Sequence, residues 1–302
     1  MFVVSLSCDP GIGKAVAAEA GWAHCEALRK VFPDGERYVR IPDECAPDGE
    51  RVVVIQSMYP NQDSMIVEAL LAADALKEAT GLEPIVVVPY LAYARQDRVF
   101  LPGEAVSVRA VLSALHSAGY GGLIVVDIHK EDSLKYFPGR AVNVLPVRTL
   151  AKALEGFVED PLVVSPDKGA ARRAEALSKA LGTEYRIVEK FRDRVTGEIK
   201  HRFMPMPEVK ERDVVVVDDI VSTGGTMASV ASFLKEQGAR RVIVAVSHGP
   251  LSEKALVRLT NAGVTKIFSM ATTCYRLDHP LITYLSPVEE VLQAIKEVVG
   301  MG

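Results

Sequence analysis

The chain lacks the features that would place it in a membrane, on nucleic acid or in a secretory pathway. No stretch of its 302 residues reaches the roughly 18 apolar residues in a row that a membrane span needs. The start carries no basic segment and meets Asp9 early, so we expect no signal peptide and a cytoplasmic location. The formal net charge of -4 gives no general attraction to nucleic acid or to an anionic membrane. An anionic substrate must therefore be bound by a local site.

Cysteine is also scarce. Four cysteines are present, Cys8, Cys25, Cys45 and Cys274, and no two of them form a Cys-x-x-Cys pair. Their spacing matches no zinc or redox motif, so buried or free thiols are the simplest interpretation. Pairing of two of them stays open, since some intracellular proteins of thermophiles carry disulfides.

What is present is the composition of a packed globular protein, with 49% hydrophobic and 25% charged residues. The length suggests about two domains of roughly 150 residues, each able to bury its own core. Short β-branched runs alternate with helical patterns. The main strands are expected at 52–56, 85–89, 123–127, 162–165, 214–218 and 242–247, and the main helices at 64–80, 107–118, 168–181, 226–237 and 252–262. Because several strands are apolar throughout, we predict an α/β fold with parallel sheets covered by helices on both faces.

The two halves of the chain look alike. Runs 123–127 and 214–218 are both buried strand patterns that end in a carboxylate. They indicate an internal duplication with a boundary near Pro146. We therefore predict an N-terminal domain at 1–146 and a C-terminal domain at 147–286, with the helix pattern in 287–302 packing back on the first domain.

The strongest chemical signal lies between Asp213 and Thr226. Four valines make a central strand, and Asp218 and Asp219 follow at its carboxyl end, where ligands bind in open α/β sheets. A helix then opens on hydroxyls and glycines: Ser222, Thr223, Gly224, Gly225 and Thr226. Glycines let backbone N–H groups approach an anion, and the helix N-terminus adds partial positive charge. With carboxylates that accept hydrogen bonds from sugar hydroxyls, the pattern predicts a sugar phosphate site; a polar capping turn explains neither the paired Asp nor the paired Gly.

A second glycine-rich segment, from Pro10 to Lys14, is not a nucleotide P-loop. The P-loop pattern requires Gly six residues before the Lys, and Cys8 stands there. The residue after the Lys is Ala15, which offers no hydroxyl to magnesium. We expect a turn that leads into a helix at 14–20.

The segment 213–226 resembles the phosphoribosyl-binding loop of the phosphoribosyltransferase superfamily. Further segments, from Phe32 to about Tyr275, narrow the resemblance to the ribose-phosphate pyrophosphokinase family. It implies two phosphoribosyltransferase-like domains, of which the first binds ATP and the second binds ribose 5-phosphate. The implied reaction is attack of the ribose 1-hydroxyl on the β-phosphorus of ATP, assisted by Mg²⁺, which yields 5-phosphoribosyl 1-diphosphate and AMP. By resemblance, Asp218, Asp219 and the residues from Ser222 to Thr226 bind ribose 5-phosphate.

Two further segments resemble the family's ATP-binding elements. The family's Phe-x-Asp-Gly-Glu loop reaches the adenine of ATP on a neighbouring subunit, and its counterparts here are Phe32, Asp34, Gly35 and Glu36. The resemblance therefore implies a homo-oligomer, of a size that the sequence leaves open. The family's Tyr-x-Arg-Gln-Asp-Arg stretch also contacts ATP, through the counterparts of Arg95, Gln96 and Asp97. Taken alone, the first segment is also typical of a hairpin turn, and the second is also typical of a charged loop.

Three more segments complete the implied machinery. Val126 to Lys130 resembles the family's Val-Asp-Leu-His stretch, which implies that His129 contacts magnesium; imidazole is not a preferred magnesium ligand, so resemblance alone supports this role. Asp167, at another strand-to-helix turn, would approach a second magnesium ion. Lys190 and Arg192 resemble the family's Lys-x-Arg element beside a loop with its tip near Thr196, where two cations can stabilise the transferring group, and Arg192 would also contact ribose 5-phosphate.

Ser222 departs from the best-known bacterial and mammalian pattern, which has Asp there, and resembles the archaeal type. The change puts regulation by phosphate and ADP in doubt. A transferase acting on a nucleobase would share the 218–226 loop but would not need Arg95 or His129. A non-catalytic relative would be free to lose Lys190 and Asp167. We expect no nucleic acid or membrane partner.

Overall fold

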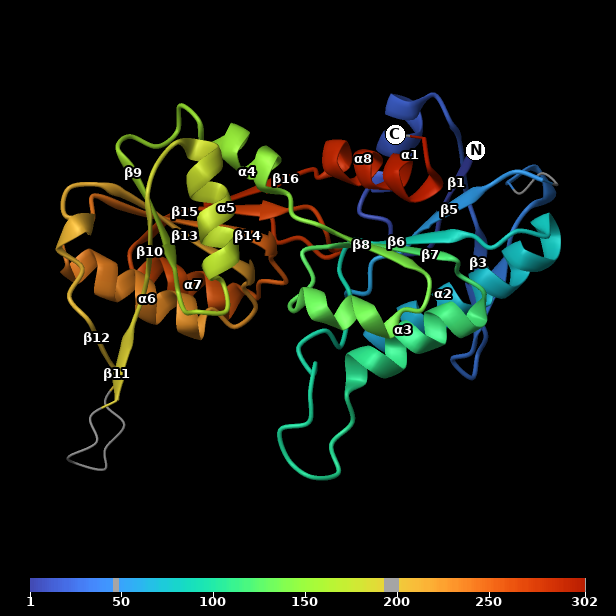
Figure 1. Ribbon diagram of the computed structural model, residues 1–302, viewed down its shortest axis with the longest axis horizontal. Helices are drawn as coiled ribbons and strands as arrows, with labels where there is room; N and C mark the ends of the chain where they lie inside the picture. The colour runs from blue at the N-terminus through green and yellow to red at the C-terminus, as the bar shows by residue number, and fades with distance from the viewer. Residues whose placement is uncertain (46–48, 193–200, 302) are drawn as a thin grey trace. The chain divides into compact units, whose positions relative to one another are not determined.

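The computed structural model describes residues 1–45, 49–192 and 201–301, and for residues 190–192, 201 and 202 it describes the backbone alone. The chain divides into two compact units: Met1–Leu145 with Ala271–Tyr275 and Ser286–Gly302, and Pro146–Met270 with Arg276–Leu285. In the described ranges, no helix combines the length and hydropathy that a membrane crossing requires. Each unit is an α/β fold (Figure 1).

The first unit contains a six-stranded parallel sheet in the order β2-β1-β5-β6-β7-β8. Its strands are β1 (Phe2–Ser5), β2 (Ala23–Glu26), β5 (Val52–Ile55), β6 (Ile85–Val88), β7 (Gly122–Val126) and β8 (Arg140–Val144). Its helices are α1 (Ile12–Ala20), α2 (Gln62–Thr80), α3 (Ser107–Ala118) and α8 (Val288–Val299). Helices α1 and α8 pack on one face of the sheet, and α2 and α3 pack on the other. A separate antiparallel hairpin pairs β3 (Leu28–Val31) with β4 (Arg37–Arg40).

The second unit has a six-stranded parallel sheet in the order β10-β9-β13-β14-β15-β16. Its strands are β9 (Pro161–Ser165), β10 (Tyr185–Ile187), β13 (Asp213–Ile220), β14 (Arg241–His248), β15 (Val264–Met270) and β16 (Ile282–Leu285). Its helices are α4 (Val147–Leu154), α5 (Ala171–Leu181), α6 (Gly225–Glu236) and α7 (Glu253–Asn261). Helices α6 and α7 cover one face, and α4 and α5 cover the other. A hairpin of β11 (Lys190–Arg192) and β12 (His201–Phe203) is inserted before β13.

The two units share one topology. Counted along the chain within each unit, the strand order is 2-1-3-4-5-6 in both sheets, and an antiparallel pair lies between the second and third strands of each. The predicted α/β fold with two similar domains is therefore confirmed. The proposed equivalence of runs 123–127 and 214–218 is wrong. The first run lies in β7, the fifth strand of its sheet along the chain, whereas the second lies in β13, the third strand of the other sheet. A valine-rich strand that ends in Asp arises wherever a buried strand reaches a polar edge, so it does not identify the position of the strand in the sheet.

The run of valines in β13 is explained by burial on both faces. Val214 and Val216 belong to the core under α6 and α7, whereas Val215 and Val217 belong to the core under α4 and α5. Successive side chains of a strand point to opposite faces, so a strand covered on both sides is apolar throughout. This packing fixes β13 at the centre of the second sheet and brings its polar end to a defined place.

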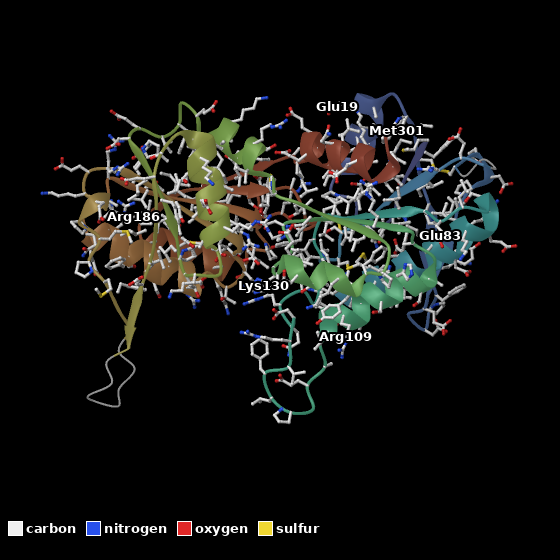
Figure 2. The ribbon with its side chains drawn as sticks, in the orientation of Figure 1. Glu19, Glu83, Arg109, Lys130, Arg186 and Met301 are labelled. Atoms are coloured by element: carbon white, nitrogen blue, oxygen red, sulfur yellow. A yellow bond between two sulfur atoms is a disulfide. The ribbon has the colours of Figure 1, made fainter. Side chains whose placement is uncertain are left out.

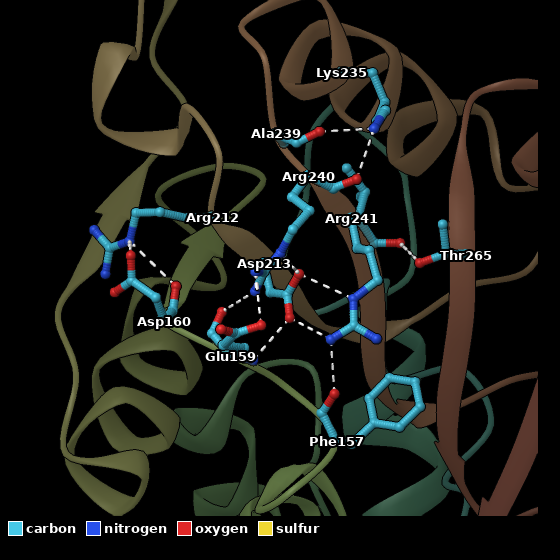
Figure 3. A network of polar contacts seen from close by, with 11 residues as sticks. Phe157, Glu159, Asp160, Arg212, Asp213, Lys235, Ala239, Arg240, Arg241 and Thr265 are labelled. Atoms are coloured by element: carbon cyan, nitrogen blue, oxygen red, sulfur yellow. Dashed lines mark hydrogen bonds and ion pairs between the residues drawn. The ribbon is translucent and has the colours of Figure 1, made fainter.

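A network of polar contacts ties together the amino end of the same sheet (Figure 3). Asp213 is fully buried at the start of β13. Its Oδ1 accepts hydrogen bonds of 2.9 Å from Nε of both Arg240 and Arg241, and its Oδ2 accepts one of 2.8 Å from the Glu159 N–H and another from Arg241. Burial alone would raise the pKa of Asp213, but these hydrogen bonds outweigh burial and hold that pKa well below its usual range.

All four cysteines are paired, which corrects the expectation of thiols. Cys8 is bonded to Cys274 and Cys25 to Cys45, with Cα–Cα distances of 5.6 and 5.8 Å. Cys8 and Cys274 are 266 residues apart in sequence, so only folding brings them together. The same return segment is held by Ser57, whose hydroxyl donates to the Thr272 carbonyl at 2.6 Å. Residues 271–275 are thereby fixed to the first unit.

The start of α1 agrees with the rejection of a P-loop. Oδ1 of Asp9 accepts hydrogen bonds from the N–H groups of Gly11 and Ile12 at 2.9 and 2.7 Å, and Oδ2 accepts one from Gly13 at 2.9 Å. A carboxylate thus occupies the place where a P-loop would bind phosphate. A side chain at Gly13 would clash, because an added Cβ would lie 2.4 Å from the Ser5 hydroxyl. The glycine there serves close packing.

Candidate active site

The central strand of the second unit ends in two adjacent carboxylates. β13 extends two residues beyond the predicted end and includes Asp218 and Asp219. The Asp219 N–H donates to Asp218 Oδ1 at 2.9 Å, and the Asp219 side chain is only 7% exposed. Burial and then the repulsion of Asp219 raise the pKa of Asp218. Hydroxyl donors or a cation at this edge would relieve that repulsion, so the pair is suited to a ligand rich in such groups.

Arg173 also belongs to this site, although no sequence motif assigned it a role. Its Nη2 lies 3.9 Å from Asp219 Oδ2, its Nη1 donates to the Gly169 carbonyl at 3.5 Å, and its side chain is 10% exposed. The guanidinium therefore links the carboxylate pair to the turn between β9 and α5. The only sequence signal was a basic residue on the helix after Asp167, which an exposed helical position would explain equally well.

Asp167 lies in that same turn and is exposed. Its Oδ1 accepts a hydrogen bond of 2.7 Å from the Gly169 N–H, and its carbonyl accepts one of 2.6 Å from the Ser165 hydroxyl. These bonds fix the turn, and Arg173 connects it to Asp219. The predicted metal ligand therefore lies on the same edge of the sheet as the carboxylate pair.

The loop from Ser222 to Thr226 connects β13 to α6. Gly224 is the N-cap of α6, with a φ of 71° and no side-chain cap. A Cβ at Gly224 would lie 3.3 Å from Leu259 Cγ and 3.4 Å from the Ala255 carbonyl, so α7 packs directly behind the loop. A positive φ and this close approach together require glycine. The first N–H groups of α6 have no side-chain acceptor at the cap, which suits them to an anion.

The first unit carries the predicted ATP elements. The Phe32–Glu36 segment is the tip of the β3–β4 hairpin, closed by a 2.8 Å hydrogen bond from the Phe32 N–H to the Glu36 carbonyl. Asp34 and Glu36 are exposed, and Gly35 has a φ of 96°. The Phe32 ring lies edge-on to Tyr38, with 6.1 Å between centroids, and Lys30 lies over it at 4.5 Å. Next to this turn, Arg37 at the start of β4 lies 3.8 Å from the buried Glu68.

Arg95, Gln96 and Asp97 lie on a long loop after β6, which Figures 1 and 2 show projecting from the first unit near α3. Arg95 is exposed and Asp97 is half-buried. The Gln96 amide donates to the Arg98 carbonyl at 3.2 Å and to Glu104 at 3.4 Å. Glu104 also accepts from the Phe100 and Leu101 N–H groups at 2.8 and 2.9 Å. Gln96 and Glu104 thus hold the loop in one shape, and Arg95 stays accessible to a ligand.

His129 follows β7 and is half-buried. The neighbouring Asp127 is buried with a φ of 46°, an unusual conformation for a residue other than glycine. The Ile128 N–H donates to the Asn143 side chain at 2.9 Å, which helps to hold this bend. Strained backbone at the end of a central strand is typical of a functional turn. His129 belongs to the first unit, and Asp167 belongs to the second.

The backbone of Lys190 and Arg192 forms β11, with Lys190 opposite Phe203 and Arg192 opposite His201. Their side chains, and the predicted loop tip at Thr196, lie outside what the structure describes. Among the described residues, no three His, Cys, Asp or Glu side chains form a ready metal cluster. Proteins commonly hold magnesium through one or two carboxylates together with substrate phosphates. The half-buried Asp218 and the buried Asp219 provide carboxylate oxygens of this kind.

The fold and this site define the class. A parallel sheet whose third strand ends in Asp-Asp, followed by a glycine-opened helix, is of the phosphoribosyltransferase type, and residues 147–274 match the model of the phosphoribosyl transferase domain. Residues 1–119 match the model described as the N-terminal domain of ribose phosphate pyrophosphokinase. The chain belongs to the ribose-phosphate pyrophosphokinase family, a family of transferase enzymes, as predicted.

Similar proteins support this assignment over most of the chain. A ribose-phosphate pyrophosphokinase of Sulfurisphaera tokodaii is 43% identical over 90% of this chain and 93% of its own length. One from Pyrococcus furiosus is 44% identical over 77% of this chain and 81% of its own length. The crystal structure of phosphoribosylpyrophosphate synthetase from Mycobacterium smegmatis superimposes with a TM-score of 0.88 at 29% identity, covering 100% of this chain and 99% of that one. The similarity to archaeal members agrees with the type that Ser222 indicated.

Proposed function

We propose that the chain transfers the β,γ-diphosphoryl group of ATP to the 1-hydroxyl of ribose 5-phosphate, which yields 5-phosphoribosyl 1-diphosphate and AMP. The observation that carries this proposal is the Asp218–Asp219 pair near the end of β13, with Asp219 buried and Asp218 half-buried, followed by a helix that has no side-chain cap. The carboxylates accept hydrogen bonds from vicinal ribose hydroxyls. The N–H groups and hydroxyls from Ser222 to Thr226 hold the 5-phosphate. The acceptor is thus fixed at both ends, and such positioning supplies much of the catalysis in phosphoryl transfer.

The donor ATP is held by the first unit. Arg95 provides charge to the phosphates, and Gln96 and Asp97 shape the loop around it. Phe32, Asp34, Gly35 and Glu36 complete the ATP site of a neighbouring copy, where the ring stacks on adenine and the carboxylates accept from its amine. Exposed apolar side chains near the hairpin support a homo-oligomer: Leu28, Val31, Val67 and Leu71 are 50%, 54%, 45% and 39% exposed.

Charge on the transferring group is neutralised by cations. Lys190 and Arg192 stabilise the charge that develops during transfer, and Arg192 also contacts ribose 5-phosphate. His129 would contact the magnesium ion of the nucleotide, and Asp167 would approach a second magnesium ion; magnesium supplies charge neutralisation at the ATP oxygens when it is bound. We also propose that the protein is located in the cytoplasm.

The assay that tests this proposal is direct. The purified protein is incubated with ATP, magnesium and ribose 5-phosphate, and the nucleotide product is identified. We expect AMP and 5-phosphoribosyl 1-diphosphate in equal amounts. Formation of ADP, or no turnover, would contradict the proposed reaction. A nucleobase transferase would instead consume 5-phosphoribosyl 1-diphosphate when a base is added.

Lys190→Ala is expected to lower kcat by about 100-fold or more while the affinity for ribose 5-phosphate stays nearly unchanged. The reason is that a cation acting on the transferring group contributes to the transition state and little to acceptor binding. Steady-state kinetics and calorimetric titration with ribose 5-phosphate measure the two effects. Lys14→Ala is the matched control, because Lys14 is an exposed lysine of the rejected P-loop and should keep full activity. A similar loss of affinity and kcat in Lys190→Ala would mean that Lys190 binds the acceptor.

A further inference from the structure

One arginine outside the predicted site contacts the phosphate-binding loop. Arg258 lies on α7, and its Nη1 donates a hydrogen bond of 3.0 Å to the Thr223 carbonyl. The same atom lies 3.5 Å from the point where a Cβ on Gly225 would be placed. The guanidinium therefore bridges from α7 to the turn that opens α6. No motif includes Arg258, and the proposed reaction assigns it no role.

The contact fixes the orientation of one peptide group. The Thr223 carbonyl and the Gly224 N–H belong to the same planar trans peptide, so they point in opposite directions. While Arg258 holds the carbonyl on the α7 side, the N–H of Gly224 must point away from α7, towards the open side of the loop. Leu259 Cγ and the Ala255 carbonyl, from the same helix, would lie only 3.3 and 3.4 Å from a Cβ placed on Gly224, so α7 packs close behind this residue.

The charge of Arg258 acts in the same direction. A hydrogen bond from a guanidinium to a carbonyl is charge-assisted and polarises the peptide, which makes its N–H a stronger donor. The positive charge also adds to the partial positive charge of the α6 N-terminus. An anion on the open side of the loop therefore meets an N–H that is both aimed and strengthened.

We propose that Arg258 is a positioning residue for the 5-phosphate of the acceptor: through the Thr223–Gly224 peptide it aims a backbone donor at the phosphate without touching it. This inference rests on the proposed binding of ribose 5-phosphate at Asp218–Thr226. It predicts that α7, which holds none of the residues assigned to substrate, contributes to acceptor affinity.

The surroundings of Arg258 permit a specific rescue experiment. A groove of about 440 Å³ runs beside the residue, lined by Gly225, Ser229, Ser232, Arg258 and Asn261 among others. A small guanidinium ion can enter this groove when the arginine side chain is removed. Lys254, one turn earlier on α7, is also exposed and provides a control that removes an equal charge from the same helix.

The test compares Arg258→Ala, Arg258→Lys and Lys254→Ala with the unchanged protein. We expect Arg258→Ala to weaken ribose 5-phosphate binding about tenfold, measured by calorimetric titration and as KM, with KM for ATP changed less than about twofold. Low millimolar guanidinium chloride should restore affinity to Arg258→Ala and leave Lys254→Ala unaffected. Arg258→Lys should lie between, because it keeps the charge but not the fork geometry.

The outcomes separate this inference from the proposed reaction. If the unchanged protein binds ribose 5-phosphate but forms no AMP, the proposed reaction is wrong. The titrations with ribose 5-phosphate still test whether Arg258 contributes to acceptor affinity. Normal affinity in Arg258→Ala, or equal loss in Lys254→Ala, would overturn the role of Arg258. So would a loss that guanidinium does not restore, or one that affects ATP as much as ribose 5-phosphate. An unchanged protein that does not bind ribose 5-phosphate overturns both.

Discussion

Asp218→Asn is expected to yield a protein that is more stable than the original and close to inactive. The substitution keeps the size of the side chain and removes its charge. Burial and the neighbouring Asp219 raise the pKa of Asp218, so its ionised form is disfavoured in the folded protein. Removing this charge should raise the free energy of unfolding at pH 8 by on the order of 1–3 kcal/mol. The same change should lower kcat/KM for ribose 5-phosphate by about 100-fold, because a charged hydrogen-bond acceptor is lost.

The pH dependence of this effect has a definite sign. The folded pKa of Asp218 lies above the unfolded value near 3.9, so the folded state binds more protons between the two. The stability of the unchanged protein should therefore fall as pH rises from about 4 through the raised pKa of Asp218, and Asp218→Asn should lack this part of the slope. Chemical denaturation of both proteins from pH 4 to pH 8 measures this difference in how the free energy of unfolding depends on pH.

Glu236→Gln is the control for Asp218→Asn. Glu236 is an exposed carboxylate at the end of α6, and its replacement should change stability by less than about 0.5 kcal/mol and leave activity intact. A less stable Asp218→Asn protein at pH 8 would show that repulsion at the site is not the dominant effect. Full activity in that variant would show that the charge of Asp218 is not needed to bind the acceptor.

Asp213→Ala should cause the largest loss of stability, about 3–5 kcal/mol. Asp213 is fully buried, and its removal leaves Arg240 and Arg241 without the carboxylate that both bond. These contacts join the starts of β13 and β14 to the chain after α4, so the amino end of the second sheet should loosen. Calorimetric unfolding measures the loss, with binding of ribose 5-phosphate as a check that the opposite edge survives.

Comparison with Asp160→Asn isolates the effect of burial. Asp160 belongs to the same network in Figure 3 and pairs with Arg212 at 3.3 Å, but its side chain is 70% exposed. Its loss should cost less than about 1 kcal/mol, because exposed ion pairs contribute little. The folded pKa of Asp213 is depressed, so its contribution is complete above the unfolded pKa near 3.9 and is lost as pH falls through the folded value. Equal losses from both variants would contradict a special role for the buried carboxylate.

The sequence predicted the interior of the fold better than its margins. The expected helix at 107–118 has the bounds of α3, and the helix pattern in 287–302 contains α8. The valine run in 214–218 lies in the central strand β13. The edge strands β2, β8, β10 and β16 were not predicted, because their exposed or half-buried side chains show neither continuous burial nor clear alternation. The interior strands β1 and β15 were not predicted either. An edge strand is defined by its one neighbour, which the local sequence does not reveal.

The candidate site was also predicted only in part. Asp218, Asp219 and the glycines were predicted because strand end, loop and helix start are consecutive in sequence. Arg173 and Arg258 were missed because their contacts come from α5 and α7, which the fold brings to the loop from other parts of the chain. The cysteine pairs were missed for the same reason. Residues that support a site from a distance become visible only with the structure.

The bond between Cys8 and Cys274 turns most of the polypeptide into a covalent ring. Two of the four crossings of the chain between the units, at residues 145–146 and 270–271, lie inside that ring, and the other two, at 275–276 and 285–286, lie outside it. One proteolytic cut anywhere between the two cysteines therefore leaves a single covalent molecule, and its fragments separate only after reduction. The ring also limits the unfolded chain, whose ends near residues 8 and 274 cannot diffuse apart. Because Cys274 is bonded to Cys8, residues 271–275 stay covalently attached to the start of the first unit even when the chain between the two cysteines unfolds.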